Sequence, residues 1–417
     1  MKTVIGFGAP NKQGTAKAHG APLGETETAL AKETYQWLHE PFYVPKEVQD
    51  KLKQSIDRNL AVIGNWQLEL EHFTETQPEL AQNLKRAIEG KIEIDGSAFS
   101  EFDQEMSTRD AFGQVINQIA PQVSTLLGGS ADLSGSNKTL LYNEDHFGPK
   151  NYAGRNIFYG VREHAMGAIM NGMCLHGGVV PYAGTFLVFS DYLRPSIRLA
   201  ALMKQPALYV FTHDSIAVGE DGPTHEPIEQ ITALRCIPGL VVLRPADAEE
   251  TAQGLRFALE HRDRPVAFAL TRQKLPIIQE LKGKYDDFKK GAYILYEAGT
   301  LGDDTILFMA TGSEIQLVLE AAKKLAAEGK SVRVINMTSM EQFDAQPKSY
   351  REAVLPSALN RRVAVEMGHP MPWYKYLGTD GKVLAVERFG ASAPGNIVMS
   401  EFGFTVENVL KLAADWD

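Results

Sequence analysis

The sequence feature that most constrains the fold is an alternation of short β-rich runs and helical patterns that begins near Thr108. The β-rich runs are "VSTLLGGSADL", "NIFYGV", "VVPYAGTF", "PALYVFTHDS", "LVVLRPAD" and "PVAFALTR". Helical patterns lie between several of these runs, at residues 186–203, 225–235 and 247–261. Strands that alternate with helices build βαβ units, so this region predicts a doubly wound parallel sheet wrapped by helices, in the α/β class.

A second, smaller α/β domain is predicted after Gly283. Its β-rich runs are "DTILFMATG", "VRVINMT", "RVAVEMG" and "VLAVERFG", and a last helix is expected at about 405–415. At the other end of the chain, residues 2–8 predict a short strand that a loop rich in Gly, Pro and Asn follows. A charged helical stretch from Glu25 to about Ile94, interrupted by two prolines, predicts helices that link domains.

Composition and charge exclude several classes of protein. The net charge of −10 and the lack of a long Lys/Arg block argue against a nucleic-acid surface. The cysteines, Cys174 and Cys236, form no CxxC pair, so we expect no structural zinc, a reducing compartment and apolar packing for both. No run approaches the roughly 18 apolar residues of a membrane span, and no signal-peptide core is seen. We therefore expect a cytoplasmic protein, or one in an organelle such as the plastid stroma after processing.

Polar residues follow several of the predicted strands and indicate where a ligand binds. The strand ends read "GGSAD", "THDS", "RPAD" and "TRQ". Ligands of open parallel sheets bind beyond the carboxyl ends of the strands, so we expect the site there. The turn "ATGSE" at 310–314 could also hold a phosphate, although such a segment is more often only a tight connection between a strand and a helix.

The stretch "GVREHAMGAIMNG", residues 160–172, places Glu163 in the first turn of an apolar predicted helix. An acid at this position complements the helix dipole, which stabilises the helix by a few tenths of a kcal/mol to about 1 kcal/mol. A functional carboxylate is the alternative, and this stretch alone does not decide between the two.

The densest polar cluster is "THDSIAVGEDGPTHEP" at 212–227, which holds His213, Asp214, Glu220, Asp221 and His225. Its histidines are twelve residues apart in a predicted loop and no cysteine joins them, so a zinc site is weakly indicated. Acid–base chemistry or recognition of sugar hydroxyls fits these side chains better.

Two further groups complete the candidates. Arginine forks suit phosphate oxygens, and this group holds Arg109, Arg162 and Arg272, with Ser136 and Asn137. For any single arginine, a surface salt bridge is the commoner role. The second group is aromatic, with Phe186, Phe189 and Tyr192 spaced to share nearly one helical face, where core packing is the usual explanation.

Together these stretches resemble the transketolase family. The resemblance is carried, in the family's order, by "IGFGAPNKQGTAKAHGAPLG", "GGSADLSGSN", "GVREHAMGAIMNG", "TFLVFSDY", "HDSIAVGEDGPTHEPIEQ" and "RPADAEE", and it continues to "EFGFTVENV" near the end. It implies three regions: a remnant of a diphosphate-binding domain with linker helices (1–100), a pyrimidine-binding domain (101–282) and a C-terminal transketolase domain (283–417). The expected cofactor is thiamine diphosphate.

The resemblance also implies a role for each candidate residue. The position of Glu163 hydrogen-bonds a pyrimidine nitrogen of the cofactor, which answers the question that this carboxylate raises. The positions expected to bind the cofactor are Glu163, Phe186, Phe189, Tyr192 and His19. The positions expected to be catalytic are Glu163, His225 and His19, and those expected to bind the sugar phosphate are Arg109, Ser136, His213, Asp221, His225 and Arg272.

The implied reaction transfers a two-carbon ketol unit from a ketose phosphate to an aldose phosphate, as in the pentose phosphate pathway or the Calvin cycle. The cofactor supplies the carbanion chemistry, and the protein supplies orientation, a proton relay and phosphate clamps. Positioned proton transfer contributes roughly 10²–10⁴-fold to the rate.

The sequence departs from the family at the metal site. The Gly-Asp-Gly turn that gives oxygen ligands for Mg²⁺ or Ca²⁺ does not occur, so no metal ligand is assigned here and the ligands are expected on a missing domain or a partner chain. Three hypotheses follow. In the first, the chain is the C-terminal part of a transketolase, which works with a separate N-terminal chain or as a homodimer, or is a fragment of a longer chain. In the second, it is a truncated non-catalytic relative with a binding or regulatory role. In the third, it is a β-type subunit of a thiamine-dependent 2-oxoacid dehydrogenase. The first and third differ in the sugar-binding motifs, which favour the first.

Overall fold

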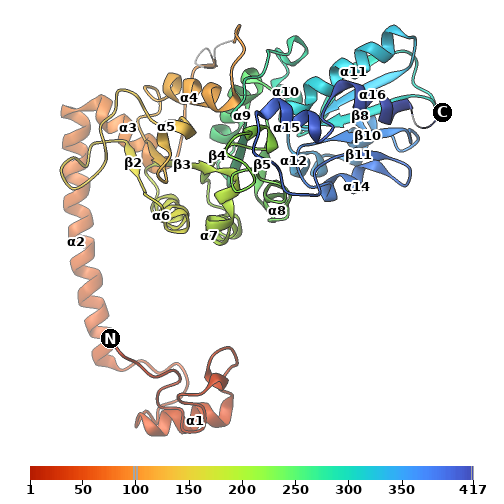
Figure 1. The fold of residues 1–417 in the computed structure, drawn as a ribbon. Coiled ribbons are helices and arrows are strands. Elements are labelled where there is room, and N and C mark those ends of the chain that lie inside the picture. The colour runs from red at the N-terminus through yellow and green to blue at the C-terminus, as the bar shows by residue number, and fades with distance from the viewer. Residues whose placement is uncertain (97–98, 100–101, 415, 417) are drawn as a thin grey trace. The chain divides into compact units, whose positions relative to one another are not determined.

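The computed structural model describes residues 1–96, 99, 102–414 and 416 (Figure 1). Contacts divide the chain into two compact units, Met1–Ala81 and Gln82–Asp417. No helix among the described residues is long and apolar enough to cross a bilayer.

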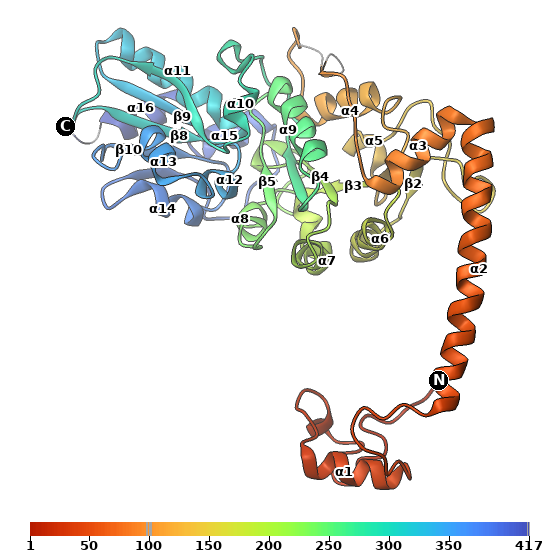
Figure 2. The same cartoon turned by 180° about the vertical axis from the view of Figure 1, so that it is seen from behind.

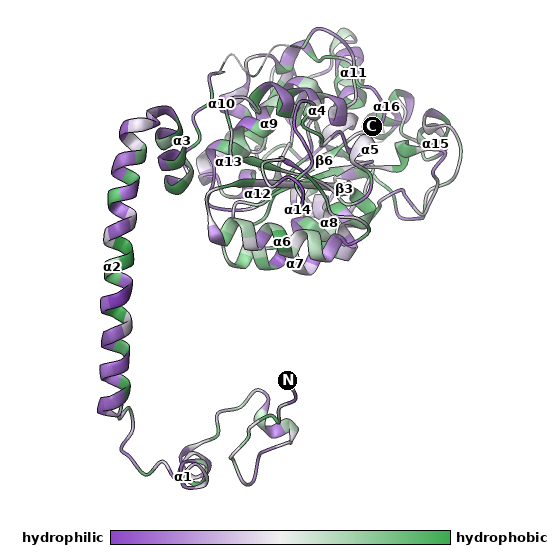
Figure 3. Ribbon diagram, turned by 90° about the vertical axis from the view of Figure 1, so that its left-hand side faces the viewer, coloured by the Kyte–Doolittle hydropathy of each residue, from purple (hydrophilic) through white to green (hydrophobic). Residues whose placement is uncertain are grey.

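The first unit is helical, as predicted for most of its length. It contains the short 3-10 helix η1 (Ala16–Ala18), α1 (Glu25–Thr34) and α2 (Lys46–Thr76), and the next helix, α3 (Pro78–Glu89), begins in it. The predicted helical stretch is interrupted between α1 and α2, where Pro41 and Pro45 lie, because a proline ring is incompatible with a helix interior. Figure 3 shows hydrophobic and hydrophilic residues along the whole of α2, and none of its side chains is buried.

The strand predicted at residues 2–8 is wrong. Residues 5–8 form turns, and Ile5 accepts a backbone hydrogen bond from Gly14. A strand needs a neighbour to satisfy its backbone groups, and the described part of the first unit contains no strand. The apolar run "VIGFG" therefore satisfies its backbone in a local turn instead.

The first sheet of the second unit has the predicted parallel arrangement. Its order among the described residues is β2-β1-β3-β4-β6-β5, and every pair is parallel. The strands are β1 (Leu126–Ser130), β2 (Asn156–Phe158), β3 (Val180–Phe186), β4 (Leu208–Thr212), β5 (Val241–Leu243) and β6 (Val266–Leu270).

Helices cover both faces of this sheet, as Figures 1 and 2 show, with α4 and α9 on one face and α6, α7 and α8 on the other. The alternation along β4 explains the arrangement, because Leu208 and Val210 join one buried cluster while Tyr209 and Phe211 join another. The helices are α4 (Thr108–Ile119), α5 (Ser134–Asn137), α6 (Glu163–His176), α7 (Ser190–Leu202), α8 (Gln230–Arg235) and α9 (Ala248–Glu260).

Two predicted helices start later than expected. The helix predicted at 225–235 begins at Gln230, because Pro227 disfavours helical backbone at the residue before it. The helix predicted at 186–203 is split, since Phe186 ends β3 and the 3-10 helix η3 (Leu187–Phe189) precedes α7. Of the two cysteines, Cys174 packs against the buried cluster, whereas Cys236 is exposed, so the expectation of apolar packing fails for the second.

The second sheet has the order β11-β10-β8-β9-β7 among the described residues. Its strands are β7 (Tyr293–Ala298), β8 (Ile306–Ala310), β9 (Val332–Asn336), β10 (Arg362–Val365) and β11 (Lys382–Leu384). The strand β7, which lies at an edge and pairs antiparallel with β9, was not predicted from the sequence. Its alternation of buried and more exposed side chains is the signal that could have predicted it.

The helices that follow the first sheet in sequence are α10 (Tyr285–Phe288), α11 (Ile315–Ala327), α12 (Met340–Asp344), α13 (Lys348–Val354), α14 (Tyr374–Leu377), α15 (Gly395–Glu401) and α16 (Val406–Ala414). Of these, α11 and α14 pack on the second sheet, whereas α10 contacts α9 and α15 contacts the 3-10 helix at Ile216–Val218. The last helix agrees with the prediction at 405–415, although residue 415 lies outside the described residues.

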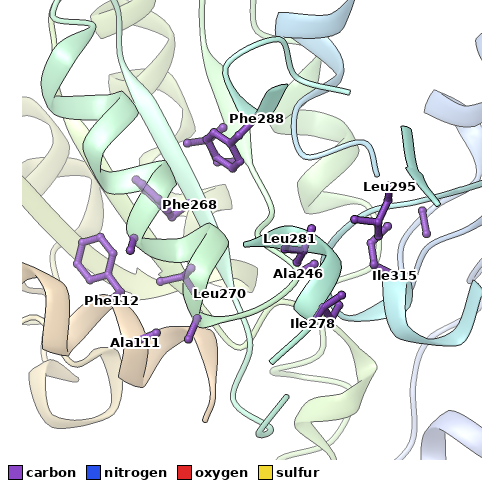
Figure 4. Close-up of a cluster of buried hydrophobic side chains, with 14 of the residues drawn as sticks. Ala111, Phe112, Ala246, Phe268, Leu270, Ile278, Leu281, Phe288, Leu295 and Ile315 are labelled. Atoms are coloured by element: carbon purple, nitrogen blue, oxygen red, sulfur yellow. The ribbon is translucent and has the colours of Figure 1, made fainter. Parts of the chain in front are cut away.

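One hydrophobic cluster joins the two sheets. Figure 4 shows it extending from Phe112 and Phe268, beside the first sheet, through Phe288 to Leu295 and Ile315 of the second. All five side chains are at most 7% exposed. The division into domains at residues 100 and 282 stays a prediction, and the first of these boundaries falls on positions outside the described residues.

Candidate active site

The carboxyl edge of the first sheet brings several predicted site residues together. Phe186 ends β3, His213 directly follows β4, and Arg272 lies two residues beyond the end of β6. These three strands are immediate neighbours in the sheet, which is why residues far apart in sequence meet at this edge. The predicted strand ends "THDS" and "TRQ" therefore lie side by side, whereas their role as a ligand site stays a prediction.

His213 lies at the centre of this edge in an unusual backbone conformation. Its φ of 60° is in the left-handed region, which a non-glycine residue seldom adopts without support from its surroundings. Its Nδ1 lies 2.8 Å from Thr212 Oγ1, and its Nε2 lies 3.4 Å from a guanidinium nitrogen of Arg109. The ring stacks on Phe186 with a centroid separation of 3.6 Å. These contacts fix the imidazole, which is only 2% exposed.

The surroundings of His213 keep its imidazole neutral. Burial lowers its pKa to about 3, and the positive charges of Arg109 and Arg272 and the nearby His225 act in the same direction. At neutral pH the ring therefore offers one N–H donor and one acceptor rather than a positive charge. Both ring nitrogens already lie beside a partner, Thr212 Oγ1 and the guanidinium of Arg109, so the neutral ring helps to position Arg109 without adding charge to the site.

The two arginines are brought together by reciprocal hydrogen bonds between the residues that precede them. The Thr108 amide donates to Thr271 Oγ1 at 3.0 Å, and the Thr271 amide donates to Thr108 Oγ1 at 2.7 Å. This pair of hydrogen bonds joins the first turn of α4 to the end of β6. Arg109 and Arg272 each directly follow one of the two bonded threonines and are therefore held near each other. The effect of the Arg272 charge on the pKa of Arg109, which burial also lowers, reflects their proximity.

Arg109 also reaches the segment after β1. Its Nη1 donates to the backbone carbonyl of Ser136 at 3.0 Å, within α5. Asn137 in the same short helix is buried and has a structural role, since it accepts from Ser130 Oγ and donates to Thr212 Oγ1. Ser136 therefore lies beside Arg109, whereas the neighbouring Asn137 links the ends of β1 and β4 through its hydrogen bonds to Ser130 and Thr212.

The loop that carries Asp221 and His225 faces the same edge. The ring of His225 lies 6.0 Å from Phe186 and 5.5 Å from Phe189, between ring centroids. The carboxylate of Asp221 is exposed and close enough to raise the pKa of Arg109. The site therefore combines two guanidinium groups, two imidazoles and one carboxylate, a set that can bind phosphate oxygens and sugar hydroxyls.

The predicted aromatic group is contiguous although it spans three kinds of backbone. Phe186 and Phe189 stack in parallel with centroids 5.9 Å apart, and Tyr192 lies 6.0 Å from Phe189. Phe186 is buried, Phe189 is half-buried, and Tyr192 is 64% exposed. An aromatic surface that stays partly accessible can stack on a flat ring of a ligand.

Glu163 begins α6, which follows β2 at the same edge of the sheet. The residue is 8% exposed, and its carboxylate has no hydrogen-bond or ion-pair partner among the described residues. Because β1 lies between β2 and β3, two strand spacings, about 10 Å, separate the ends that carry Glu163 and Phe186. No described contact joins Glu163 to Phe189 or His213, so a ligand placed between them stays a prediction.

The structure does not bring every candidate to this edge. His19 is exposed and lies in the first unit, directly after η1, so its relation to the site stays a prediction. Arg162 is exposed, and its Nη1 donates to the Tyr159 carbonyl rather than joining the other arginines. Asp214 points away into a buried ion pair with Arg244. No group of three or more His, Cys, Asp or Glu side chains that could hold a metal occurs among the described residues.

The turn "ATGSE" is not free to bind a phosphate. The guanidinium of Arg244 packs against Gly312, whose φ is +60°, and a Cβ at this position would lie 2.8 Å from Arg244 Nε. Arg244 Nη1 donates to the Thr311 carbonyl at 3.2 Å. The alternative interpretation as a tight connection between strand and helix therefore holds, with a buried arginine in the place where an anion would lie.

Several buried polar residues that lie next to the candidate site were not predicted from the sequence. Thr108, Thr271, Arg244 and Glu226 were not selected, although all are buried polar side chains. Thr271 and Arg244 stand within the strand-end sequences "TRQ" and "RPAD", so their position was the available signal. The sequence alone does not show which side chain of such a strand end faces a ligand and which is buried in the protein interior.

Three family models match this chain, each over a separate region. Residues 1–93 match the transketolase thiamine diphosphate-binding domain, and residues 104–277 match the transketolase pyrimidine-binding domain. Residues 291–405 match the transketolase-like C-terminal domain.

Whole proteins give the same result. A transketolase from Geobacillus stearothermophilus is 53% identical over 99% of this chain, and the match covers 62% of that relative. A transketolase structure from Leishmania mexicana matches with a TM-score of 0.91 and 37% identity, covering 99% of this chain and 61% of that one. A transketolase from Pichia stipitis, solved in complex with sedoheptulose-7-phosphate, matches with a TM-score of 0.90 and 36% identity over 100% of this chain and 62% of that one. The chain thus spans slightly more than three fifths of the length of these relatives.

Proposed function

Because the chain belongs to the transketolase family, we propose that it takes part in the transfer of a two-carbon ketol unit from a ketose phosphate to an aldose phosphate. The observation that carries this proposal is the meeting of Arg109, Arg272, His213 and His225 at one edge of the parallel sheet. The sugar-binding motifs favour this reaction over that of a 2-oxoacid dehydrogenase subunit.

The basic end of the site is the proposed sugar-phosphate clamp. Arg109 and Arg272 offer guanidinium forks, and the neutral ring of His213 lies beside Arg109 without adding charge. Ser136, next to Arg109, completes the set on the side of α5. Asp221 accepts hydrogen bonds from sugar hydroxyls in this proposal. The related Pichia stipitis enzyme in complex with sedoheptulose-7-phosphate supports a ligand of this class.

The residues present also fit the aminopyrimidine of thiamine diphosphate. The buried carboxylate of Glu163 has no described partner, and a protonated ring nitrogen of the cofactor would supply one. Phe186, Phe189 and Tyr192 offer the aromatic surface against which a pyrimidine ring stacks. When bound, the cofactor supplies the carbanion chemistry that cleaves and forms the carbon–carbon bond.

Within this scheme each protein residue has a limited task. Glu163 holds a proton-sharing hydrogen bond at the pyrimidine nitrogen, which favours the tautomer needed for proton transfer. His225, which is only partly buried and lies against Phe186 and Phe189, moves protons to and from sugar oxygens near the reacting carbons. His19 is proposed to assist on the same side of the sugar and to approach the diphosphate.

The diphosphate and its Mg²⁺ or Ca²⁺ are proposed to bind outside the described residues. The match to the diphosphate-binding domain is confined to residues 1–93, and no metal ligands are assigned within the described part of the chain. We therefore propose that the site is completed by a further transketolase segment, either in the same polypeptide or on a partner chain. We also propose that the active enzyme is a dimer with two such sites. Exposed apolar side chains on and beside α6 and α7, such as Val161 and Leu202, are consistent with cover by another surface.

Complementation tests this proposal directly. The 417-residue chain is titrated with thiamine diphosphate in a calorimeter, with and without Mg²⁺, and assayed for ketol transfer between sugar phosphates. Weak binding and no useful turnover are expected, because the charge of the diphosphate is poorly compensated without a bridging cation site. Addition of a chain that carries a Gly-Asp-Gly diphosphate-binding domain is expected to restore binding and transfer together. Tight metal-dependent binding and turnover by the chain alone would contradict the need for a further segment, and failure of both after complementation would favour a non-catalytic relative.

A further inference from the structure

A buried ion network connects the two sheets of the second unit, and Arg244 lies at its centre. The residue follows β5 of the first sheet and is 1% exposed. Its guanidinium donates from Nε to Asp214 Oδ2 at 2.9 Å and from Nη2 to Glu314 Oε1 at 3.2 Å, and Nη1 also donates to Glu314 Oε2. Asp214 lies just beyond the end of β4 in the first sheet, whereas Glu314 ends the 3-10 turn Gly312–Glu314 that follows β8 of the second sheet and leads into α11.

The second sheet holds Arg244 from several directions. Glu314 is fully buried and accepts further hydrogen bonds from Ser313 Oγ at 2.6 Å and from the Met367 amide at 3.2 Å. The backbone of Arg244 is also bound, since its amide donates to the Thr338 carbonyl at 3.1 Å and its carbonyl accepts from the Gly312 amide at 3.1 Å. The guanidinium therefore has little freedom to rotate away from Asp214.

Asp214 transmits this anchoring to the site, because it is the residue directly after His213. One carboxylate oxygen of Asp214 binds Arg244, and the other is buried without a hydrogen-bond partner. A buried carboxylate with a single strong partner stays in place only while that partner does. The left-handed backbone of His213 is thus fixed between Thr212, which bonds its ring, and Asp214, which is tied to the second sheet.

We propose that Arg244 is a positioning residue for sugar-phosphate recognition, through which the second sheet holds His213 in its strained conformation between Arg109 and Phe186. This inference rests on the proposed function. It assigns to the second, C-terminal sheet a task at the substrate site, although none of the residues of the candidate site lies on that sheet. Arg244 acts only through Asp214 and His213 and touches no reacting atom.

A neighbouring arginine provides a matched control. Arg235 takes part in the same network and binds Glu366 with two hydrogen bonds of 2.8 Å, but it has no described contact with Asp214. The side chains of Arg235 and Arg244 are 5% and 1% exposed, so replacement of either by lysine disturbs a buried arginine–carboxylate pair. A general loss of stability would affect both variants, whereas misplacement of His213 is expected only for Arg244.

The test compares Arg244→Lys and Asp214→Asn with Arg235→Lys, each in the complemented enzyme that contains the diphosphate-binding domain. Lysine keeps the charge but cannot contact Asp214, Thr311 and Glu314 together, because an ammonium is a compact group on one stem. For Arg244→Lys and Asp214→Asn, KM for a phosphorylated acceptor is expected to rise about tenfold or more, since small misplacements of binding groups have large effects. KM for a non-phosphorylated acceptor is expected to change less than about threefold, and Arg235→Lys is expected to change neither by more than about twofold.

A second measurement separates this inference from the proposed function. The titration of the His213 ring, followed by NMR in the 417-residue chain, reports its burial whether or not the chain is active. Arg244→Lys is expected to move the ring pKa up toward its ordinary value, and Arg235→Lys is expected to leave it unchanged. An unmoved His213 titration in Arg244→Lys, or equal KM changes in the two lysine variants, would overturn the positioning role. Absence of ketol transfer in the wild-type complemented enzyme would instead contradict the proposed function alone.

Discussion

The rings of Phe186 and His213 stack with their centroids 3.6 Å apart, and this contact closes the end of β4 against solvent. Burial lowers the pKa of His213 to about 3, so the ring should show no protonation step between pH 5 and 8 when its NMR signals are followed. Phe186→Ala opens one face of the ring to water and should raise that pKa by about one unit or more.

His261 serves as the internal reference for this experiment, because its ring lies against Phe257 on α9 at the end of a different helix. Phe186→Ala should leave the His261 signals unchanged. A His213 ring that titrates near its ordinary value in the wild-type chain would contradict the buried, neutral state on which the proposed clamp depends.

Loss of a clamp residue should affect phosphorylated sugars in particular. In the complemented enzyme, Arg272→Ala and His213→Ala should raise KM for a phosphorylated acceptor by about tenfold or more, while kcat changes little. The reason is that the clamp binds the phosphate equally in the ground state and the transition state. Steady-state kinetics with phosphorylated and non-phosphorylated acceptors measure the difference.

Arg264→Ala is a suitable control for these variants, because Arg264 precedes β6 at the opposite edge of the sheet and pairs with Asp263. It should leave both KM values unchanged. Equal losses on phosphorylated and non-phosphorylated acceptors would remove Arg272 and His213 from the phosphate role.

The sequence predicted those parts of the fold where local pattern and burial agree. The runs around β3, β4 and β6 are continuous apolar segments because both faces of the sheet are covered, so their strands were found within a few residues. The failures lie where a partner decides the outcome. Residues 2–8 have strand composition but no neighbouring strand, and β7 is a half-exposed edge strand that pairs with β9 across an intervening strand and helix.

The candidate site was predictable in part for the same reason. The carboxyl ends of parallel strands lie at the same side of the sheet, so His213 and Arg272 could be grouped from the strand ends "THDS" and "TRQ", whereas Phe186 was grouped only with the other aromatic residues. The direction of each side chain could not be predicted. His213 and Asp214 are adjacent in sequence, but the His213 side chain faces the candidate site and the Asp214 side chain faces Arg244. The left-handed φ of His213 separates them, and no pattern of residue types encodes that angle.

Replacement of Glu163 by glutamine tests whether this carboxylate acts in a proton relay or only complements the dipole of α6. In the complemented enzyme, Glu163→Gln should lower the rate of ketol transfer by about 10²-fold or more, because the amide cannot share a proton with the pyrimidine. The melting temperature should hardly change, since the carboxylate has no described partner to lose. Paired measurements of rate and melting decide the matter. A stability loss of about 1 kcal/mol with normal turnover would instead support the dipole role alone.

Glu226 should make the stability of the chain depend on pH. It is 2% exposed beside Gly390 and follows His225 in the loop of the candidate site. Burial raises its pKa to about 7, with a contribution from the charge of Asp221, against the opposing effect of the backbone amides of Ala391 and Gly219. The folded state therefore keeps a proton that the unfolded chain releases near pH 4.5, so stability falls as the pH rises from about 4.5 to 7 and the penalty is constant above that range.

Glu226→Gln removes this charge while it keeps the size of the side chain, and it should therefore melt at a higher temperature than the wild type at pH 8. The gain should be on the order of a few kcal/mol and should vanish well below pH 4.5, where the wild-type carboxyl is protonated in both states. Glu220→Gln is the matched control, because Glu220 is exposed in the same loop and its described hydrogen bond is made by the backbone carbonyl, which accepts from Ser392 Oγ at 2.7 Å. Its melting curve should follow the wild type at every pH. A Glu226→Gln curve that runs parallel to the wild type from pH 5 to 8 would show that Glu226 is ionised throughout this range in the folded chain.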